Sequence, residues 1–147
     1  MTSATGQDQV SRTSRAAVVR GFYEAIAAKD VTALNDIASN RFAEDIALVI
    51  PASLPYGGTI VGATKLGRMF GAMAAAPTPM GASDITVTEI IDAGDVICAA
   101  IEFEWIYPGT SNSLRSGALE VWRFADDRVT EIRAYYTDTA QLLALAP

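Results

Sequence analysis

The sequence predicts an α+β fold in which helices come first and cover one face of a curved antiparallel sheet. Two observations carry this prediction. Apolar residues recur at helical spacing early in the chain, at Val19, Phe22, Tyr23 and Ile26. From residue 83 onward they alternate with polar residues instead, as in strands with one buried face. Helices packed on one face of an antiparallel sheet form a stable two-layer arrangement.

The predicted elements follow one another without a visible repeat or second domain. We expect a disordered polar leader over residues 1–11 and a single domain over 12–147. The expected helices cover residues 12–29, a second stretch capped by Asp30 and running to about 38, 63–75, and a short segment, 139–146, capped by Asp138. The expected strands cover residues 44–50, 84–92, 95–107, 113–125 and 128–138, and residues 51–62 form a loop rich in proline and glycine.

Composition excludes several classes of function. The chain has no histidine and a single cysteine, so catalytic relays through imidazole and ordinary structural zinc sites are excluded. No glycine-rich phosphate-binding pattern is present, and we expect no cofactor. The net charge of −6 argues against nucleic acid as a partner. No apolar run is long enough to span a membrane and the start lacks a secretory signal, so we expect a cytoplasmic protein.

The order of the elements resembles the nuclear transport factor 2-like superfamily and, within it, the SnoaL-like branch. The resemblance covers about residues 12–145 and lies in three successive segments, "GFYEAIAAKDVTALNDI", "LPYGGTIVGATKLGRMF" and "VWRFADDRVTEIRAYYTD". It implies a cone-shaped domain, in which a strongly bent sheet wraps on a long helix and an apolar pocket opens at the wide end. Members include steroid delta-isomerase, limonene epoxide hydrolase, polyketide cyclases, dehydratases and non-catalytic binding subunits, so the fold does not fix the function.

The resemblance also implies roles for individual positions. Compared with steroid isomerase, Glu120 takes the place of a buried carboxylic acid that stays neutral and donates a hydrogen bond. The proton-abstracting aspartate of that enzyme corresponds to Ile50, and its helix-borne tyrosine corresponds to Phe22. Compared with limonene epoxide hydrolase, the aspartate of the final strand corresponds to Ala134. The chain therefore lacks essential groups of both mechanisms.

Alternation along the strands and the resemblance together predict the pocket lining, because side chains on one face recur every second residue. We expect Phe103 and Trp105 to point inward, since the opposite register would place Glu102 and Glu104 in the cavity, where desolvation is costly. Tyr56 is expected across the mouth. The predicted substrate-binding residues are Phe22, Ile50, Tyr56, Met69, Phe70, Met73, Phe103, Trp105, Trp122 and Ala134.

One carboxylate interrupts the apolar pattern of the strand at 113–125. Glu120 lies on the same alternating face as Trp122 and Phe124. It is either a structural acid satisfied by an arginine or a pocket tyrosine, or the main polar group of an apolar cavity, held neutral by burial. We favour the second interpretation because aromatic residues flank it on the same face. Arg123 and Arg133 have the opposite parity and are expected to point away.

The sequence predicts a cofactor-independent cyclase that folds an apolar, polyketide-type substrate for intramolecular ring closure. Holding a flexible chain in a reactive conformation lowers the barrier without a strong base. Glu120 and Tyr136 are the candidate catalytic residues, because a hydrogen bond to a substrate carbonyl would activate it. The alternatives are a dehydratase or isomerase that uses Glu120 as acid and base, an epoxide hydrolase with a rebuilt site, and a non-catalytic binder of an apolar small molecule.

We also expect a homodimer. Apolar and aromatic residues such as Val121 and Tyr135 have the parity opposite to the pocket side, so they lie on the outer face of the long strands. A self-complementary outer face would pair two copies about a two-fold axis.

Overall fold

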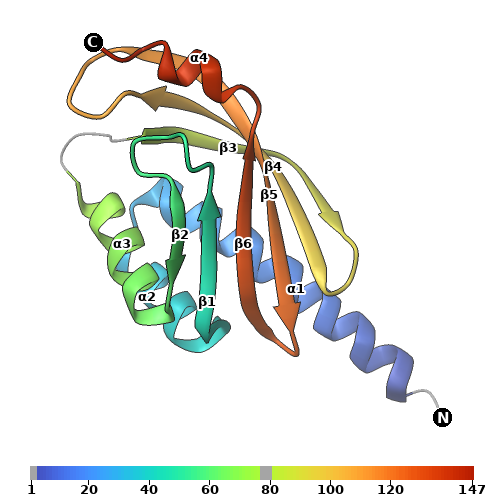
Figure 1. The fold of residues 1–147 in the computed structure, drawn as a ribbon. Coiled ribbons are helices and arrows are strands. Elements are labelled where there is room, and N and C mark those ends of the chain that lie inside the picture. Colours follow the sequence, from blue (N-terminus) through green and yellow to red (C-terminus); the bar gives the residue numbers. More distant parts are fainter. Residues whose placement is uncertain (1–2, 77–80) are drawn as a thin grey trace.

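The computed structural model describes the backbone of residues 3–76 and 81–147, and the side chains from residue 15 onward within these ranges (Figure 1). The first part of the chain contains α1 (Ser3–Ala28), α2 (Val31–Arg41), β1 (Phe42–Ile50), β2 (Gly58–Val61) and α3 (Ala63–Ala75). The second part contains β3 (Gly81–Asp92), β4 (Val96–Ile106), β5 (Ser113–Ala125), β6 (Arg128–Tyr136) and α4 (Thr139–Leu143). The predicted α+β class is confirmed.

All six strands form one sheet in the order β2-β1-β6-β5-β4-β3. Strands β3 to β6 form the expected antiparallel meander. Strand β1, however, pairs with β6 in parallel, so the sheet as a whole is mixed, whereas the sequence indicated antiparallel pairing. Short turns dictate antiparallel pairing only between successive strands. Strands β1 and β6 are far apart in the sequence, with β2 to β5 between them, so no short turn fixes the direction in which they pair.

The largest departures from the predicted elements are at the start of α1 and in the segment before α3. Helix α1 begins at Ser3, so the backbone is helical over residues 3–11, where a disordered leader was expected. A polar stretch without proline can extend a helix that is already formed downstream, because propagation is much easier than nucleation. Strand β2 lies inside the segment expected to be a loop, and it pairs with β1 from Ala47↔Val61 to Ile50↔Gly58. Four residues that begin with a glycine carry little strand signal of their own.

Three other boundaries coincide with local signals in the sequence. Asp30 caps α2, and its carboxylate accepts a hydrogen bond of 3.0 Å from the backbone nitrogen of Ala33. Asp138 caps α4 by accepting a hydrogen bond from the backbone nitrogen of Gln141. Strand β1 ends immediately before Pro51. Each of these residues adds or removes a hydrogen-bond partner of the backbone at the end of an element. Such an end can therefore be predicted from a few neighbouring residues of the sequence.

Helix α1 lies across one face of the sheet, and the core is between them (Figure 1). The predicted inward register of β4 is confirmed, since Phe103 and Trp105 are fully buried while Glu102 points outward and pairs with Arg115. Aromatic rings from three layers meet at the centre. Phe22, Tyr23, Phe42, Phe70 and Trp122 form this cluster, with ring centroids 4.9 to 6.5 Å apart.

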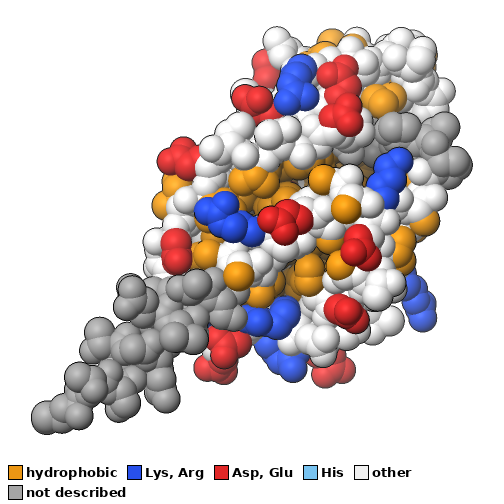
Figure 2. Space-filling view, turned by 180° about the vertical axis from the view of Figure 1, so that it is seen from behind, with side chains coloured by type: hydrophobic (Ala, Val, Ile, Leu, Met, Phe, Trp, Pro, Cys, Tyr) orange, Lys and Arg blue, Asp and Glu red, His pale blue; other side chains and the backbone are white. Residues whose placement is uncertain are grey.

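On the face turned toward the viewer in Figure 2, acidic and basic side chains of the described residues are interspersed, with hydrophobic side chains visible between them. No broad field of either charge covers this face. Among the described residues, no helix combines the length and the apolar character needed to cross a membrane.

We predict that the outer face of the sheet pairs two copies of the chain. Tyr135 and Leu119 are 55% and 39% exposed and are register partners on β6 and β5. Next to them, Val121 is opposite Cys98, and Cys98 is opposite Ile91, so an apolar strip crosses four strands. We expect a homodimer by light scattering, and a monomer when Leu119 and Tyr135 are both replaced by Glu.

The matched control is Val61→Glu, which changes an equally exposed apolar residue on β2, away from the strip. A wild-type chain that is a monodisperse monomer at micromolar concentration would contradict the dimer.

Candidate functional site

A cavity lies between the inner face of the sheet and helices α1 and α3. Its volume is about 390 Å³, within the range of small-molecule sites. Almost all of its wall is apolar. It is lined by Phe22, Tyr23, Ile26, Leu48, Ile50, Pro55, Tyr56, Ile60, Met69, Phe70, Met73, Gly81, Ala82, Ile85, Ile101, Phe103, Pro108, Ala118, Glu120, Ile132 and Tyr136.

Most of the residues predicted to contact a substrate do line this cavity. They are Phe22, Ile50, Tyr56, Met69, Phe70, Met73 and Phe103, together with the candidate catalytic residues Glu120 and Tyr136. Trp105, Trp122 and Ala134 point to the same side of the sheet but lie behind the lining. Tyr56 contacts the indole of Trp105 and Tyr23 contacts that of Trp122, while Ala134 is buried and is not part of the lining.

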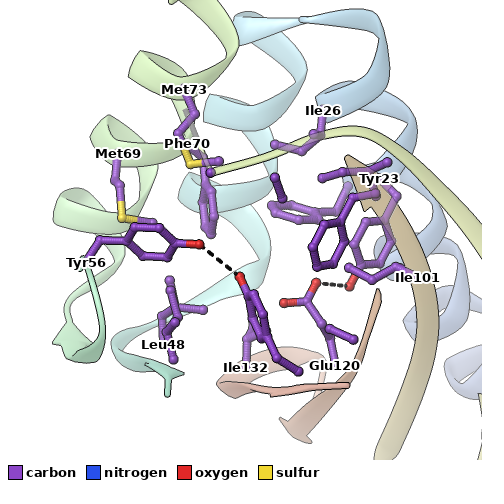
Figure 3. Close-up of a pocket in the computed structure, with 18 of the residues that line it drawn as sticks. Tyr23, Ile26, Leu48, Tyr56, Met69, Phe70, Met73, Ile101, Glu120 and Ile132 are labelled. Carbon is purple, nitrogen blue, oxygen red and sulfur yellow. Dashed lines mark hydrogen bonds between the residues drawn. The ribbon is translucent and has the colours of Figure 1, made fainter. Parts of the chain in front are cut away.

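A chain of two hydrogen bonds holds Glu120. The hydroxyl of Tyr23, on α1, donates to Glu120 Oε1 over 2.6 Å. The same hydroxyl accepts a hydrogen bond of 3.1 Å from the indole Nε1 of Trp122, which is fully buried. Figure 3 shows the carboxyl of Glu120 and the phenol of Tyr23 meeting at one side of the cavity. Each of the two interpretations of Glu120 therefore agrees with part of the structure. A tyrosine forms a hydrogen bond with the acid, as in the structural interpretation, and the acid also lines the cavity, as in the pocket interpretation.

Among the residues whose side chains the structure describes, no arginine pairs with Glu120. As expected from their parity, Arg123 and Arg133 lie on the outer face, where both pair with Glu131 at 3.6 and 3.1 Å. Burial raises the pKa of Glu120 above the ordinary value of 4.5, and the hydrogen bond from Tyr23 opposes this only in part. The carboxyl is therefore biased toward its neutral form, in which its proton can be donated into the cavity.

A second chain of the same kind lies at the mouth of the cavity. The fully buried indole of Trp105 donates a hydrogen bond of 2.6 Å to the hydroxyl of Tyr56. The Tyr56 hydroxyl also lies 3.3 Å from the hydroxyl of Tyr136, and a dashed line drawn from Tyr56 in Figure 3 marks this second bond. Burial, followed by the proximity of Tyr56, raises the pKa of Tyr136, so its hydroxyl keeps its proton. The hydroxyls of Tyr56 and Tyr136 together have two hydrogens, and the bond between them uses one. The other hydrogen can be donated to a ligand in the cavity.

The loop between β1 and β2 fixes Tyr56 over the mouth. Its backbone turns tightly, and a side chain at Gly57 would place Cβ 1.9 Å from the carbonyl oxygen of Pro51. Across the mouth, Gly81 has φ +67, and a Cβ there would lie 3.2 Å from the Tyr56 hydroxyl. Glycines at both positions therefore let the phenol reach Trp105 and Tyr136.

The site combines apolar walls with two hydrogen-bond donors and can bind a neutral molecule that carries carbonyl groups. Tyr23 was missed as a site residue, because the resemblance placed Phe22 at the tyrosine position of the isomerase. The structure instead places Tyr23, one residue later, against Glu120. Both side chains face the sheet, since α1 buries a broad stripe that includes Val19 and Ile26. The aromatic pair was a signal that either residue could reach the acid.

The sequence matches the SnoaL-like domain over residues 19–132, which is most of the chain. The chain belongs to the SnoaL-like family. Its helices and six-stranded mixed sheet are the nuclear transport factor 2-like fold, so the resemblance noted in the sequence is confirmed. No curated protein matches the chain.

Solved structures share this fold at low sequence identity. Bal32a, from a soil-derived mobile gene cassette, has a TM-score of 0.70 at 19% identity and covers 87% of this SnoaL-like chain and 92% of its own. An NTF2-like protein from Burkholderia xenovorans LB400 has a TM-score of 0.69 at 20% identity, with coverage of 91% and 97%. An NTF2-like protein of unknown function from Burkholderia pseudomallei K96243 has a TM-score of 0.68 at 22% identity, with coverage of 90% and 96%. At these identities the likeness concerns the fold alone.

We predict that Tyr23→Phe destabilises the protein by about 1 to 3 kcal/mol, because it leaves the buried indole N–H of Trp122 without a partner. Urea unfolding followed by tryptophan fluorescence measures this. Tyr135→Phe is the matched control, since that side chain is exposed on the outer face, and it should change stability little. Adding Trp122→Phe to Tyr23→Phe should cost less than the sum of the two single changes, because both partners are then absent. Strict additivity would contradict the bond.

We predict that Glu120 makes the fold less stable as pH rises. Because burial raises the folded-state pKa above 4.5, the folded protein retains a proton that the unfolded chain has released at pH values between the two pKa values. The free energy of unfolding of Glu120→Gln relative to wild type should then increase by up to about 1.4 kcal/mol per pH unit in that window. Urea unfolding of both proteins from acidic to neutral pH provides the test. A difference that does not change with pH would mean that Glu120 titrates alike in both states.

Proposed function

We propose that this SnoaL-like protein is a cofactor-independent cyclase of secondary metabolism that folds an apolar, polyketide-type substrate for intramolecular ring closure. The observation that carries the proposal is the coexistence of an apolar cavity of about 390 Å³ with a carboxyl that pairs with no cation of the described residues. Such a cavity binds a flexible apolar chain by burying its surface. Its few polar groups then select the conformation in which the reacting carbons meet.

Glu120 is proposed to act as the main activating group. In its neutral form it donates a hydrogen bond to a substrate carbonyl, which withdraws electron density from the acceptor carbon and stabilises the negative charge that develops on oxygen. Tyr23 positions the carboxyl through its 2.6 Å hydrogen bond. Tyr136, which lies on the neighbouring strand and faces the same cavity, supplies the second donor together with Tyr56.

The lining supports cyclisation over the alternative chemistries. Among the described lining residues, the groups that can titrate are Glu120 and three tyrosines, and burial raises the pKa of Tyr23 and Tyr136. An isomerase or dehydratase that abstracts a proton needs an ionised base, and the position of the isomerase base is occupied by Ile50. Epoxide opening needs a carboxylate to orient a water molecule, and Ala134 stands at the corresponding position. A β-dicarbonyl substrate can react from its enol tautomer. As the new C–C bond forms, the acceptor oxygen takes the proton of Glu120, and the resulting carboxylate recovers a proton from the enol hydroxyl, so ring closure requires no second ionised group.

We predict that turnover depends on Glu120 as a donor. With linear poly-β-keto thioesters as substrates and mass spectrometry of the cyclised products, Glu120→Gln should lower kcat by about tenfold or less, because the amide keeps the shape and a donor. Glu120→Leu should lower kcat by about 100-fold or more, in the range measured for removing one donor that stabilises developing negative charge. Binding of the apolar substrate should survive both changes.

Tyr135→Leu, on the outer face, is the control that should leave turnover unchanged. If Glu120→Leu turned over as fast as wild type, the acid would be structural and the apolar walls alone would carry the reaction. If the wild-type protein bound such substrates but converted none of them, the non-catalytic binding protein would take the place of the cyclase.

A further inference from the structure

A second hollow adjoins the main cavity at the ends of α1 and α3. Its volume is about 440 Å³, and it lies between these helix ends and the first residues of β3. It is lined by Ile26, Ala27, Lys29, Met73, Ala74, Ala76, Ala82, Ser83, Asp84, Ile85 and Thr86.

The two hollows share one wall. Ile26, Met73, Ala82 and Ile85 line both of them. Figure 3 shows Met73 and Ile26 at the same edge of the main cavity, on α3 and α1. Methionine is unbranched and has three rotatable bonds, so it adapts to different neighbours more easily than the other apolar residues here. Met73 is also 37% exposed. Within the shared wall, the flexible side chain of Met73 beside the small side chain of Ala82 is the place where an elongated ligand could pass.

The chemistry of the second hollow differs from that of the main cavity. Lys29, Ser83, Asp84 and Thr86 contribute polar groups to it, whereas the polar groups of the main cavity are those of Glu120 and the tyrosines. Lys29 and Asp84 are both exposed, and no ion pair between described residues involves either of them. Lys29 therefore lines the second hollow without an ion-pair partner among the described residues, and this hollow shares a wall with the apolar cavity.

The backbone on both sides of this hollow has unusual geometry. Lys29 and Asp84 have positive φ values of 55 and 49, a region that residues other than glycine seldom adopt. Lys29 follows the last turn of α1, where its backbone nitrogen donates to the carbonyl oxygen of Ile26. At Asp84, the pairing of β3 with β4 shifts register between Ser83 and Thr86. Both of these residues with positive φ, Lys29 and Asp84, line the second hollow.

We propose that the second hollow binds the carboxylate end of an elongated ligand whose apolar body fills the main cavity, with Lys29 as the group that binds the carboxylate. The proposal deepens the proposed function, because it rests on an apolar substrate in the main cavity and adds the character of its other end. A single negative charge fits better than a phosphate. Lys29 is the one cation among the described lining residues, and Asp84 opposes a second negative charge.

Displacement of Nile red, a neutral dye for apolar sites, tests the proposal with dodecanoic acid and methyl dodecanoate as probes. Both probes have the same apolar chain, and only the acid has the charge. At low ionic strength and neutral pH, we expect the wild-type protein to bind the acid about two- to fivefold more tightly than the ester, the range of one exposed ion pair. This preference should disappear at high salt, because exposed charges are screened.

Three variants separate the proposal from a general charge effect. Lys29→Gln should abolish the preference for the acid and leave the affinity for the ester unchanged. Lys65→Gln, which removes an exposed lysine of α3 that lines neither hollow, should leave the preference intact. Asp84→Asn should increase the preference, because it removes the opposing carboxylate.

Ester binding without a preference for the acid, or a preference that survives Lys29→Gln, would overturn the carboxylate site and leave the proposed function standing. If neither probe displaced the dye, the main cavity would not hold apolar chains of this kind, and both proposals would fall. Equal weakening of both probes by Lys29→Gln would also overturn the site, since the lysine would then support the fold and not bind the charge.

Discussion

The hydroxyl of Tyr23 is the point on which the arrangement of helix and sheet depends. It is the partner of two groups on β5, the buried indole N–H of Trp122 and one oxygen of Glu120, which is half-buried at the cavity wall. Leaving either group unsatisfied would cost free energy comparable to a sizeable part of the stability of a small domain. The bonds therefore fix the rotation of α1 about its axis. With that rotation set, Phe22 and Ile26 face the space that becomes the cavity.

The sequence predicted the faces of the elements better than their partners. Alternation in β4 was sufficient to place Phe103 and Trp105 inward and Glu102 outward, because a strand has only two faces. The parallel pairing of β1 with β6 leaves no comparable trace in either strand, since it depends on how the chain returns after β5. The contact between Tyr23 and Glu120 joins positions 97 residues apart. The periodicity of the sequence could predict that both side chains face the inner side of the sheet. It could not predict that the hydroxyl of one contacts the carboxyl of the other.

The same distinction explains which site residues were misplaced. Trp105 and Trp122 were correctly assigned to the inner face, yet each is covered by a tyrosine that accepts its N–H. A large side chain that carries a polar atom needs a partner when it is buried, and that partner then stands between it and the cavity. The short side chain of Ala134 could not be judged from parity at all. Whether a small residue lines a cavity depends on the neighbours that flank it.

The bond between Trp105 and Tyr56 has a consequence for how this cavity can change during evolution or design. The indole of Trp105 is fully buried, and its hydrogen-bond partner is a loop residue that is 37% exposed. A loop residue would normally be free to vary, but here each replacement of Tyr56 must bring another acceptor to the same place. Met69 and Met73 on α3 line the same cavity with apolar side chains, so their replacement leaves no buried donor that needs a new acceptor. New ligand preferences are therefore more accessible through the helix than through the loop that frames the entrance.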